Sequence, residues 1–256
     1  MLIDTHAHIY LAQFDQDIDE IVERSTLSGI HKIFLPNIDH TSIERMLSLE
    51  ENYGDLCIPM MGLHPCSVKE DFEKELSIVE SWLSKRAFAG IGETGIDLYW
   101  DKKFYYQQIE ALKIQLGFAR KYNIPIILHC RDSIQETINL VSTETNGSLA
   151  GIFHCFTGTY EQAMEIISFG FKLGIGGVVT FKNSQLNEVI EKIDLEHIVL
   201  ETDSPYLAPE PERGKRNEPS YLKYIAQKIA DIKEVEIEKL IDITTKNAFE
   251  LFKEWN

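Results

Sequence analysis

The chain has 256 residues, 44% of them hydrophobic, which is enough to bury one sizeable core. Its formal net charge of -16 argues against a broad basic surface that coats duplex nucleic acid, although a metal site can still supply positive charge locally. No apolar run approaches the ~20 residues that span a bilayer, and no basic segment leads into an apolar one at the start. The four cysteines show no C-x-x-C spacing, so we expect free, small apolar side chains. We therefore expect a cytoplasmic protein, a monomer or weak oligomer, without membrane contact.

Short apolar runs alternate with helical patterns along the whole chain. The first apolar run ends at His6 and His8, and the later predicted strands are 30–36, 57–63, 88–93, 124–129, 149–154, 171–175 and 197–202. The predicted helices are about 15–29, 41–54, 72–83, 103–122, 133–141, 159–170, 186–193, 219–232 and 236–253. Three capping boxes are predicted at helix starts: Thr41 with Glu44, Ser133 with Glu136, and Thr159 with Gln162.

This alternation predicts the fold class. Continuously apolar strands are typical of a parallel sheet that is covered on both faces. Eight strand–helix units without a break in composition predict an α/β protein, a single (β/α)₈ TIM barrel over residues 1–256 with an extra C-terminal helix. The alternative is a doubly wound open sheet.

Metal-ligand residue types stand where the predicted strands end. His6 and His8 alternate along one strand, so both imidazoles project to the same side. In a barrel the carboxyl ends of all strands meet at one mouth, where the active site lies. We therefore expect these six candidate ligands to converge: His6, His8, Glu93, His129, His154 and Asp203.

Four imidazoles and two carboxylates exceed the needs of one tetrahedral ion and suit two divalent ions. We expect Glu93 to bridge them, because the fourth strand lies between the first strand and the fifth and sixth. The predicted sets are His6, His8 and Asp203 on one ion, and His129 and His154 on the other. Ligands without thiolate suit Zn, Mn, Co or Mg alike. Such a centre activates water for hydrolysis, with Glu93 and Asp203 as catalytic residues and Asp203 accepting the proton.

Residues around the mouth are candidates for substrate binding. His64 contacts substrate or shapes the turn that contains Pro65. Arg131 shares the face of His129 and binds a phosphate or pairs with a buried carboxylate such as Glu201. A basic cluster after the last strand, which includes Lys215 and Arg216, predicts phosphate binding in an otherwise acidic chain.

Two further predictions concern the same region. Asp4 and Glu201 lie two residues before His6 and Asp203, so each is expected to orient a ligand histidine. Four aromatic residues, Tyr99, Trp100, Phe156 and Tyr206, are candidates for stacking nucleobases at the mouth, although aromatic residues at such junctions more often pack against the barrel.

The sequence resembles a known family. Its segments are similar to the signatures of TatD-type metal-dependent hydrolases, (β/α)₈ barrels of the amidohydrolase superfamily, and the resemblance covers essentially the whole chain. These segments are Asp4-Thr-His-Ala-His8, Gly62-Leu-His-Pro65, Gly92-Glu-Thr-Gly-Ile-Asp97, His129-Cys-Arg-Asp132, His154-Cys-Phe-Thr-Gly158, Glu201-Thr-Asp-Ser-Pro205 and Arg213-Gly-Lys-Arg-Asn217. The family more often has Gly-Glu-Ile-Gly-Leu-Asp where residues 92–97 stand, a departure that leaves Glu93 intact.

The resemblance implies a divalent-metal deoxyribonuclease that trims single-stranded DNA or RNA from the 3′ end, with the six ligands already named. Hydrolysis of a small amide, carboxylic ester or aminoacyl ester is an alternative, because barrels host many chemistries. A non-enzymatic metal-binding scaffold is a third reading, which a complete ligand set disfavours.

Overall fold

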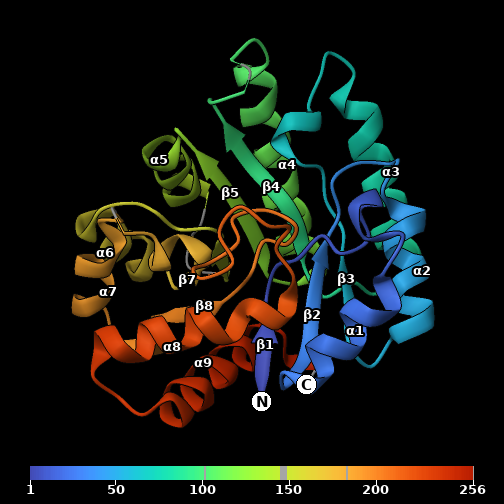
Figure 1. Ribbon diagram of the computed structural model, residues 1–256. Coiled ribbons are helices and arrows are strands. Elements are labelled where there is room, and N and C mark those ends of the chain that lie inside the picture. Colours follow the sequence, from blue (N-terminus) through green and yellow to red (C-terminus); the bar gives the residue numbers. More distant parts are fainter. Residues whose placement is uncertain (101, 145–148, 183, 256) are drawn as a thin grey trace.

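The computed structural model describes residues 1–100, 102–144, 149–182 and 184–255. Within these ranges parallel strands alternate with helices (Figure 1). The strands are β1 Leu2–Asp4, β2 Ile30–Pro36, β3 Cys57–Met60, β4 Ile91–Asp97, β5 Ile126–Arg131, β6 Gly151–Phe153, β7 Lys172–Ile175 and β8 Ile198–Leu200. The arrows of β2, β4 and β5 point toward the same end of the molecule in Figure 1, as the carboxyl ends of barrel strands do.

The strands follow one another around a ring in chain order. Regular pairing joins β1-β2-β3 and β4-β5-β6-β7-β8. Backbone hydrogen bonds connect the two groups at both seams: Met61 N donates to Gly90 O (3.0 Å), Thr5 N to Leu200 O (3.0 Å) and His8 N to Ser204 O (2.7 Å). The prediction of a TIM barrel is confirmed, because an open doubly wound sheet has a different strand order.

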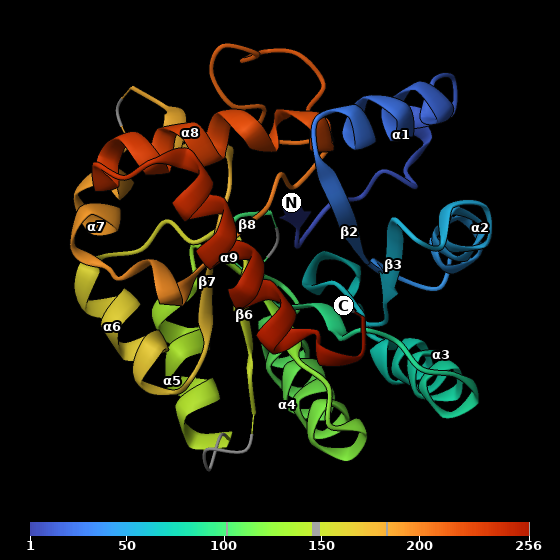
Figure 2. The same ribbon diagram turned by 90° about the horizontal axis from the view of Figure 1, so that it is seen from below.

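Amphipathic helices cover the outside of the strands. They are α1 Ile18–Leu27, α2 Ile43–Tyr53, α3 Phe72–Lys85, α4 Tyr105–Tyr122, α5 Ile134–Glu144, α6 Tyr160–Ser168, α7 Leu186–Lys192, α8 Leu222–Lys233 and the extra helix α9 Ile237–Leu251. Seen from below, α9 crosses the end of the ring that is opposite the strand tips (Figure 2). No described helix is long and apolar enough to cross a membrane.

The core of the ring is closed at this lower end by apolar side chains. Phe34 of β2 stacks on Phe252, which follows α9, with ring centres 3.8 Å apart. They belong to a buried cluster that also contains Ile3, Ile58, Met60, Ala89, Ile127, Ile152, Val199 and Ala248. Because this end is filled by apolar residues, polar side chains inside the ring are confined to the opposite mouth.

Two strands extend beyond their predicted ends. β4 continues four residues past Glu93 and β5 two residues past His129. The pairing of Gly95 with His129 and of Asp97 with Arg131 keeps both segments extended. The sequence predicted that Glu93 ends a strand, but Glu93 lies inside β4.

Helix starts follow the predicted capping boxes only in part. Thr159 and Gln162 form the predicted box at α6. The box at Thr41 was wrong, because Ser42 is the N-cap of α2 and its hydroxyl accepts the N–H of Asp39 (3.2 Å). The Ser133 hydroxyl before α5 donates instead to Ile96 O (2.5 Å), which ties that helix to β4.

Candidate metal centre

The six predicted ligands meet at the mouth of the barrel. His6, His8, Glu93 and His154 are buried, whereas His129 and Asp203 are half-buried. Three groups have ligand atoms within 4.8 Å of one another: His6 with His8 and Asp203, His6 with Glu93 and His154, and His64 with Glu93 and His129. Tertiary structure thus brings together all six residues, and His64 joins them.

The Glu93 carboxylate is surrounded by five imidazoles. Its Oε2 is 3.1 Å from His6 Nε2 and 3.2 Å from His8 Nε2. Its Oε1 is 2.7 Å from His129 Nδ1 and 3.4 Å from His154 Nε2. Oε1 is also 3.4 Å from His64 Nε2. The two carboxylate oxygens therefore face different sets of imidazole nitrogens, as those of a bridging ligand do.

Asp203 completes the half of the site nearest β1. Its Oδ1 lies 3.8 Å from His6 Nε2 and 3.7 Å from His8 Nε2. Its backbone is left-handed (φ 57°), a conformation that Asp tolerates better than most residues, and its N–H donates to His6 O (2.9 Å). This turn after β8 holds the carboxylate against the two histidines of β1.

A tyrosine that sequence analysis did not single out orients His8. The Tyr10 hydroxyl donates to Pro36 O (2.5 Å), and a carbonyl oxygen can only accept. The Tyr10 oxygen is then left to accept a proton from His8 Nδ1, 2.8 Å away. His8 Nε2 therefore presents a lone pair to the centre, as a metal ligand must.

His64 has the opposite tautomer. The backbone N–H of Cys66 donates to His64 Nδ1 (3.0 Å), so that nitrogen carries no proton. The single proton of a neutral imidazole then resides on Nε2, 3.4 Å from Glu93 Oε1. His64 thus offers an N–H donor at the centre and not a metal lone pair, which favours the predicted contact with substrate.

Asp97 is a site residue that sequence analysis missed. Its Oδ2 lies 3.0 Å from His129 Nε2, on the side of the ring away from Glu93. A carboxylate there holds the ring proton on Nε2 and leaves Nδ1 free to ligate. The available signal was the spacing to Glu93, because residues four apart on a strand share a face.

Glu201 and Asp4 differ in what they hold. Glu201 Oε1 is 2.9 Å from His154 Nδ1, close enough for an ion pair but without hydrogen-bond geometry, so its role in orienting that histidine stays a prediction. Asp4 does not touch a histidine ring. It accepts the backbone N–H of Thr202 at Oδ1 (2.9 Å) and contacts the Thr202 hydroxyl at Oδ2 (2.6 Å). Its role is to join β1 to the end of β8.

The donor set fits divalent cations. His6 Nε2 and His8 Nε2 lie only 3.1 Å apart, although the His8 nitrogen has no proton to donate, and His6 Nδ1 is buried without a hydrogen-bond partner. Within the described part of the chain, no lysine or arginine pairs with Glu93 or Asp203. Buried carboxylates that lack basic partners need another source of positive charge. Nitrogen and oxygen ligands without thiolate suit Zn, Mn, Co or Mg.

Protons supply that charge when no cation is bound. Burial opposes ionisation of Glu93, but the surrounding imidazoles, His64 first, hold its pKa well below the ordinary value. Burial would also lower the pKa of His154, yet the carboxylates of Glu201 and Glu93 raise that pKa to about 10. Burial raises the pKa of Asp203 to about 6. Metal binding at these residues therefore displaces protons and is favoured at higher pH.

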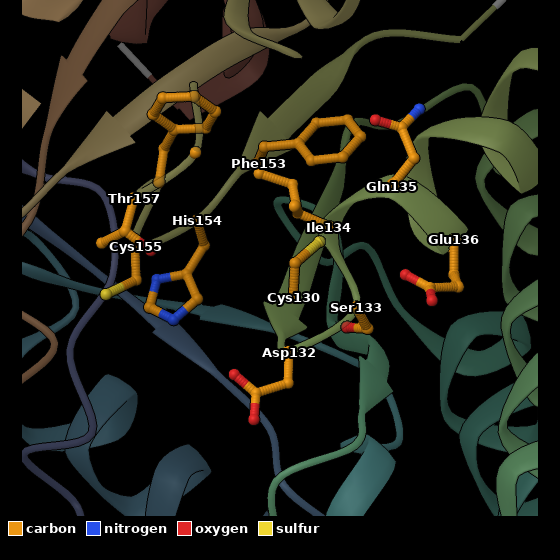
Figure 3. A pocket seen from close by; sticks show the side chains of 12 residues that line it. Cys130, Asp132, Ser133, Ile134, Gln135, Glu136, Phe153, His154, Cys155 and Thr157 are labelled. Atoms are coloured by element: carbon orange, nitrogen blue, oxygen red, sulfur yellow. The ribbon is translucent and has the colours of Figure 1, made fainter.

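A cavity of about 270 Å³ opens beside His154, between the connections β5–α5 and β6–α6 (Figure 3). Figure 3 shows the His154 ring and the Asp132 carboxylate in the lower half of the view, with the side chains of Phe153 and Ile134 above them. Its volume is near the lower end for small-molecule sites. The cavity gives one modest substrate group room next to a candidate ligand.

The basic loop after β8 is engaged with carboxylates. Arg216 donates to Asp17 Oδ1 (2.8 Å) and Oδ2 (2.5 Å), and this pair fastens the loop to the start of α1. Lys215 Nζ lies 2.6 Å from Glu212 Oε2. Phosphate binding by Lys215 and Arg216 stays a prediction.

Arg131 does not form the predicted alternative pair with Glu201, whose Oε1 instead accepts the N–H of Cys155 (2.5 Å). The Arg131 guanidinium is exposed and lies over the ring of Tyr99, 3.9 Å from its centre. No group among the described residues accepts a hydrogen bond from the Arg131 guanidinium, so its N–H edges can meet an anionic group.

The chain is similar to known proteins over almost its whole length. A model of the protein family described as TatD related DNase matches residues 3–253. The uncharacterized metal-dependent hydrolase YabD of Bacillus subtilis is 39% identical over 254 residues, which cover 99% of each chain. Human deoxyribonuclease TATDN3 is 29% identical over 98% of this chain and 94% of that protein. The crystal structure of the TatD homolog YjjV from Escherichia coli has a TM-score of 0.93 at 28% identity, covering 98% of both chains.

Proposed function

The chain belongs to the TatD-related DNase family of metal-dependent hydrolases, and from that premise we propose that it cleaves phosphodiester bonds at the 3′ end of single-stranded DNA or RNA. The observation that carries the proposal is the position of Glu93, with one oxygen toward His6 and His8 and the other toward His129 and His154. A pair of divalent ions that shares such a carboxylate is typical of phosphodiester hydrolysis.

Each ligand has a proposed place in this centre. His6, His8 and Asp203 would hold one divalent ion, His129 and His154 would hold the second, and Glu93 would be shared by both. Zn, Mg, Mn and Co all suit these ligands. When bound, such ions lower the pKa of water and offset the negative charge of a phosphate.

The residues of the chain then handle protons and position the substrate. The Asp203 carboxylate accepts the proton of the attacking water, a role that its half-buried position at the mouth permits. The water oxygen bonds to phosphorus, the bond from phosphorus to the leaving oxygen breaks, and the leaving oxygen takes up the proton that Asp203 accepted. His64 donates its Nε2 proton in a hydrogen bond to a phosphate oxygen. Arg131, Lys215 and Arg216 are the proposed contacts to neighbouring phosphates.

Hydrolysis of a small amide, carboxylic ester or aminoacyl ester is the second candidate. The observation that favours it is the pairing of Lys215 with Glu212 and of Arg216 with Asp17, in a chain of net charge -16. A substrate without a phosphate backbone does not need those cations. A steep loss of activity when Lys215 and Arg216 are neutralised supports the nuclease, and indifference supports the small substrate.

Digestion of end-labelled oligonucleotides tests the proposal. Wild type and Glu93→Ala are incubated with 3′-labelled and 5′-labelled single strands in Mg²⁺ or Mn²⁺. Glu51→Ala, which removes an exposed carboxylate from α2, is the matched control. Early loss of the 3′ label by wild type and the control alone is the expected result.

Two other outcomes contradict the proposal in different ways. Early loss of the 5′ label overturns the direction of cleavage. If wild type binds two ions but digests neither strand, the nuclease proposal is wrong and the small-substrate hydrolase remains.

A further inference from the structure

Three exposed side chains lie together beside the metal centre. Tyr99 and Trp100 follow β4, with 55% and 69% of their surfaces exposed, and Arg131 ends β5. The Arg131 guanidinium lies 3.9 Å from the centre of the Tyr99 ring and 5.3 Å from that of Trp100. The two rings meet edge to face, 5.0 Å apart. Packing against the barrel does not account for these residues, and exposed aromatic clusters mark contact surfaces.

Asp97 links this cluster to the metal centre. Its Oδ2 contacts His129 Nε2 (3.0 Å), while its Oδ1 accepts the N–H groups of Tyr99 and Trp100 (both 3.0 Å). Arg131 lies two residues beyond His129 on β5, about 7 Å farther along the strand. One carboxylate thus positions both a candidate ligand and the two aromatic residues.

We propose that Tyr99, Trp100 and Arg131 form a subsite that stacks a nucleobase of a single-stranded nucleic acid whose phosphate lies at the metal centre. This inference rests on the proposed function and specifies how that site selects its substrate.

The chemistry of the cluster matches a nucleotide and not a bare phosphate. Every base has a π face, and stacking on an aromatic ring requires no particular base. Arg131 stacks on Tyr99 through one face and keeps its N–H edges for the negatively charged backbone. In a duplex the faces of the bases are covered by their neighbours. The subsite therefore favours single strands and frayed ends.

The test compares two substrates that differ only in their bases. The kcat/KM for an oligothymidylate is measured against that for an abasic deoxyribose-phosphate strand of equal length. Trp100→Ala is expected to lower the ratio of the two values about tenfold, as for the loss of one stacked base, and Trp100→Phe to preserve it. Trp82→Ala is the matched control. Trp82 also has a cation over its ring, Lys85 Nζ at 5.4 Å, but it lies near the C-terminal end of α3.

A binding measurement makes the result independent of turnover. Thymidine 5′-monophosphate, which has no phosphodiester bond to cleave, is titrated in Mg²⁺ while tryptophan fluorescence is followed. We expect thymidine 5′-monophosphate to quench the fluorescence of wild type and deoxyribose 5-phosphate to quench it much less. In Trp100→Phe the two ligands should quench the fluorescence equally.

The outcomes separate the subsite from the nuclease. If cleavage occurs and the ratio of kcat/KM for oligothymidylate to kcat/KM for the abasic strand is the same in all variants, the subsite proposal is wrong and the nuclease proposal stands. Base-dependent quenching without any cleavage overturns the nuclease and leaves the subsite. Neither cleavage nor base-dependent quenching overturns both.

Discussion

The Tyr10 hydroxyl accepts a hydrogen bond from His8 Nδ1 at 2.8 Å, and this contact determines which nitrogen of His8 faces Glu93. Tyr10 can accept because its own proton is donated to Pro36 O. It is one of several contacts in which a neighbour of a histidine at the centre determines which ring nitrogen carries the proton.

Tyr10→Phe removes this acceptor and leaves the Nδ1 proton of His8 without a partner. Metal affinity is expected to fall about 10–100-fold, the usual effect of losing such a neighbour. Titration calorimetry of metal-free protein with Mn²⁺ measures it. Tyr53→Phe, which removes a hydroxyl bonded to exposed Asp19, is the control and should bind as wild type does. Equal affinity in both variants would show that the Tyr10 contact is not needed.

Asp97→Asn is expected to weaken one ion more than the other. The amide nitrogen would face the N–H of His129 Nε2, so the ring loses its acceptor and rotates away from Glu93. Metal content by mass spectrometry should fall from two ions toward one, with activity lost in parallel. Asp55→Asn, at an exposed position, should retain both ions. Two tightly bound ions in Asp97→Asn would contradict the role of Asp97.

Gly95→Ala is expected to damage both the fold and the centre. A Cβ at Gly95 would lie 2.0 Å from His129 O, and its φ of +147° disfavours any other residue. The strands β4 and β5 must separate locally, at a cost of about 1–3 kcal/mol or more in the free energy of unfolding. Gly117→Ala in α4, where a Cβ meets nothing within 4 Å, should instead stabilise by about 0.5–1 kcal/mol. Urea denaturation measures both; an active, fully stable Gly95→Ala would refute the clash.

Asp4 predicts how stability depends on pH in metal-free protein. Burial raises the pKa of Asp4 from 3.8 to about 8, so the folded state binds a proton that the unfolded state releases above pH 4. This contribution to stability is fully present at low pH and is lost as pH rises toward about 8. Asp4→Asn mimics the protonated acid and does not titrate. Its melting temperature should therefore exceed that of wild type by an amount that grows between pH 5 and 8. A difference that is constant with pH would contradict this assignment.

Arg216→Ala and Asp17→Ala distinguish a structural pair from a phosphate contact. If the pair only fastens the loop to α1, both variants lower the melting temperature and affect KM alike. If Arg216 also binds substrate phosphate, Arg216→Ala raises KM whereas Asp17→Ala, which removes the competing carboxylate and leaves only the bond to Gln13 O, lowers it. We expect the second pattern from the proposed function. Steady-state kinetics on an oligonucleotide measures it, and matching KM values in the two variants would remove Arg216 from substrate binding.

The sequence by itself determined the barrel and the candidate ligands. Alternation of apolar strands with amphipathic helices is a local property, and parallel strands necessarily bring their carboxyl ends to one mouth. His6, His8, Glu93, His129, His154 and Asp203 could therefore be grouped without coordinates, although they are far apart in the chain.

Tertiary structure alone decided how each side chain is used. Pairing between β4 and β5 carried both strands past their apolar cores and brought Asp97 to His129. Contacts with Tyr10 and the Cys66 N–H selected opposite tautomers for His8 and His64. Asp17 and Arg216 meet across 199 residues of chain. Periodicity reports which face of an element is apolar, but hydrogen-bond partners depend on which backbone and side-chain groups the folded chain brings within reach.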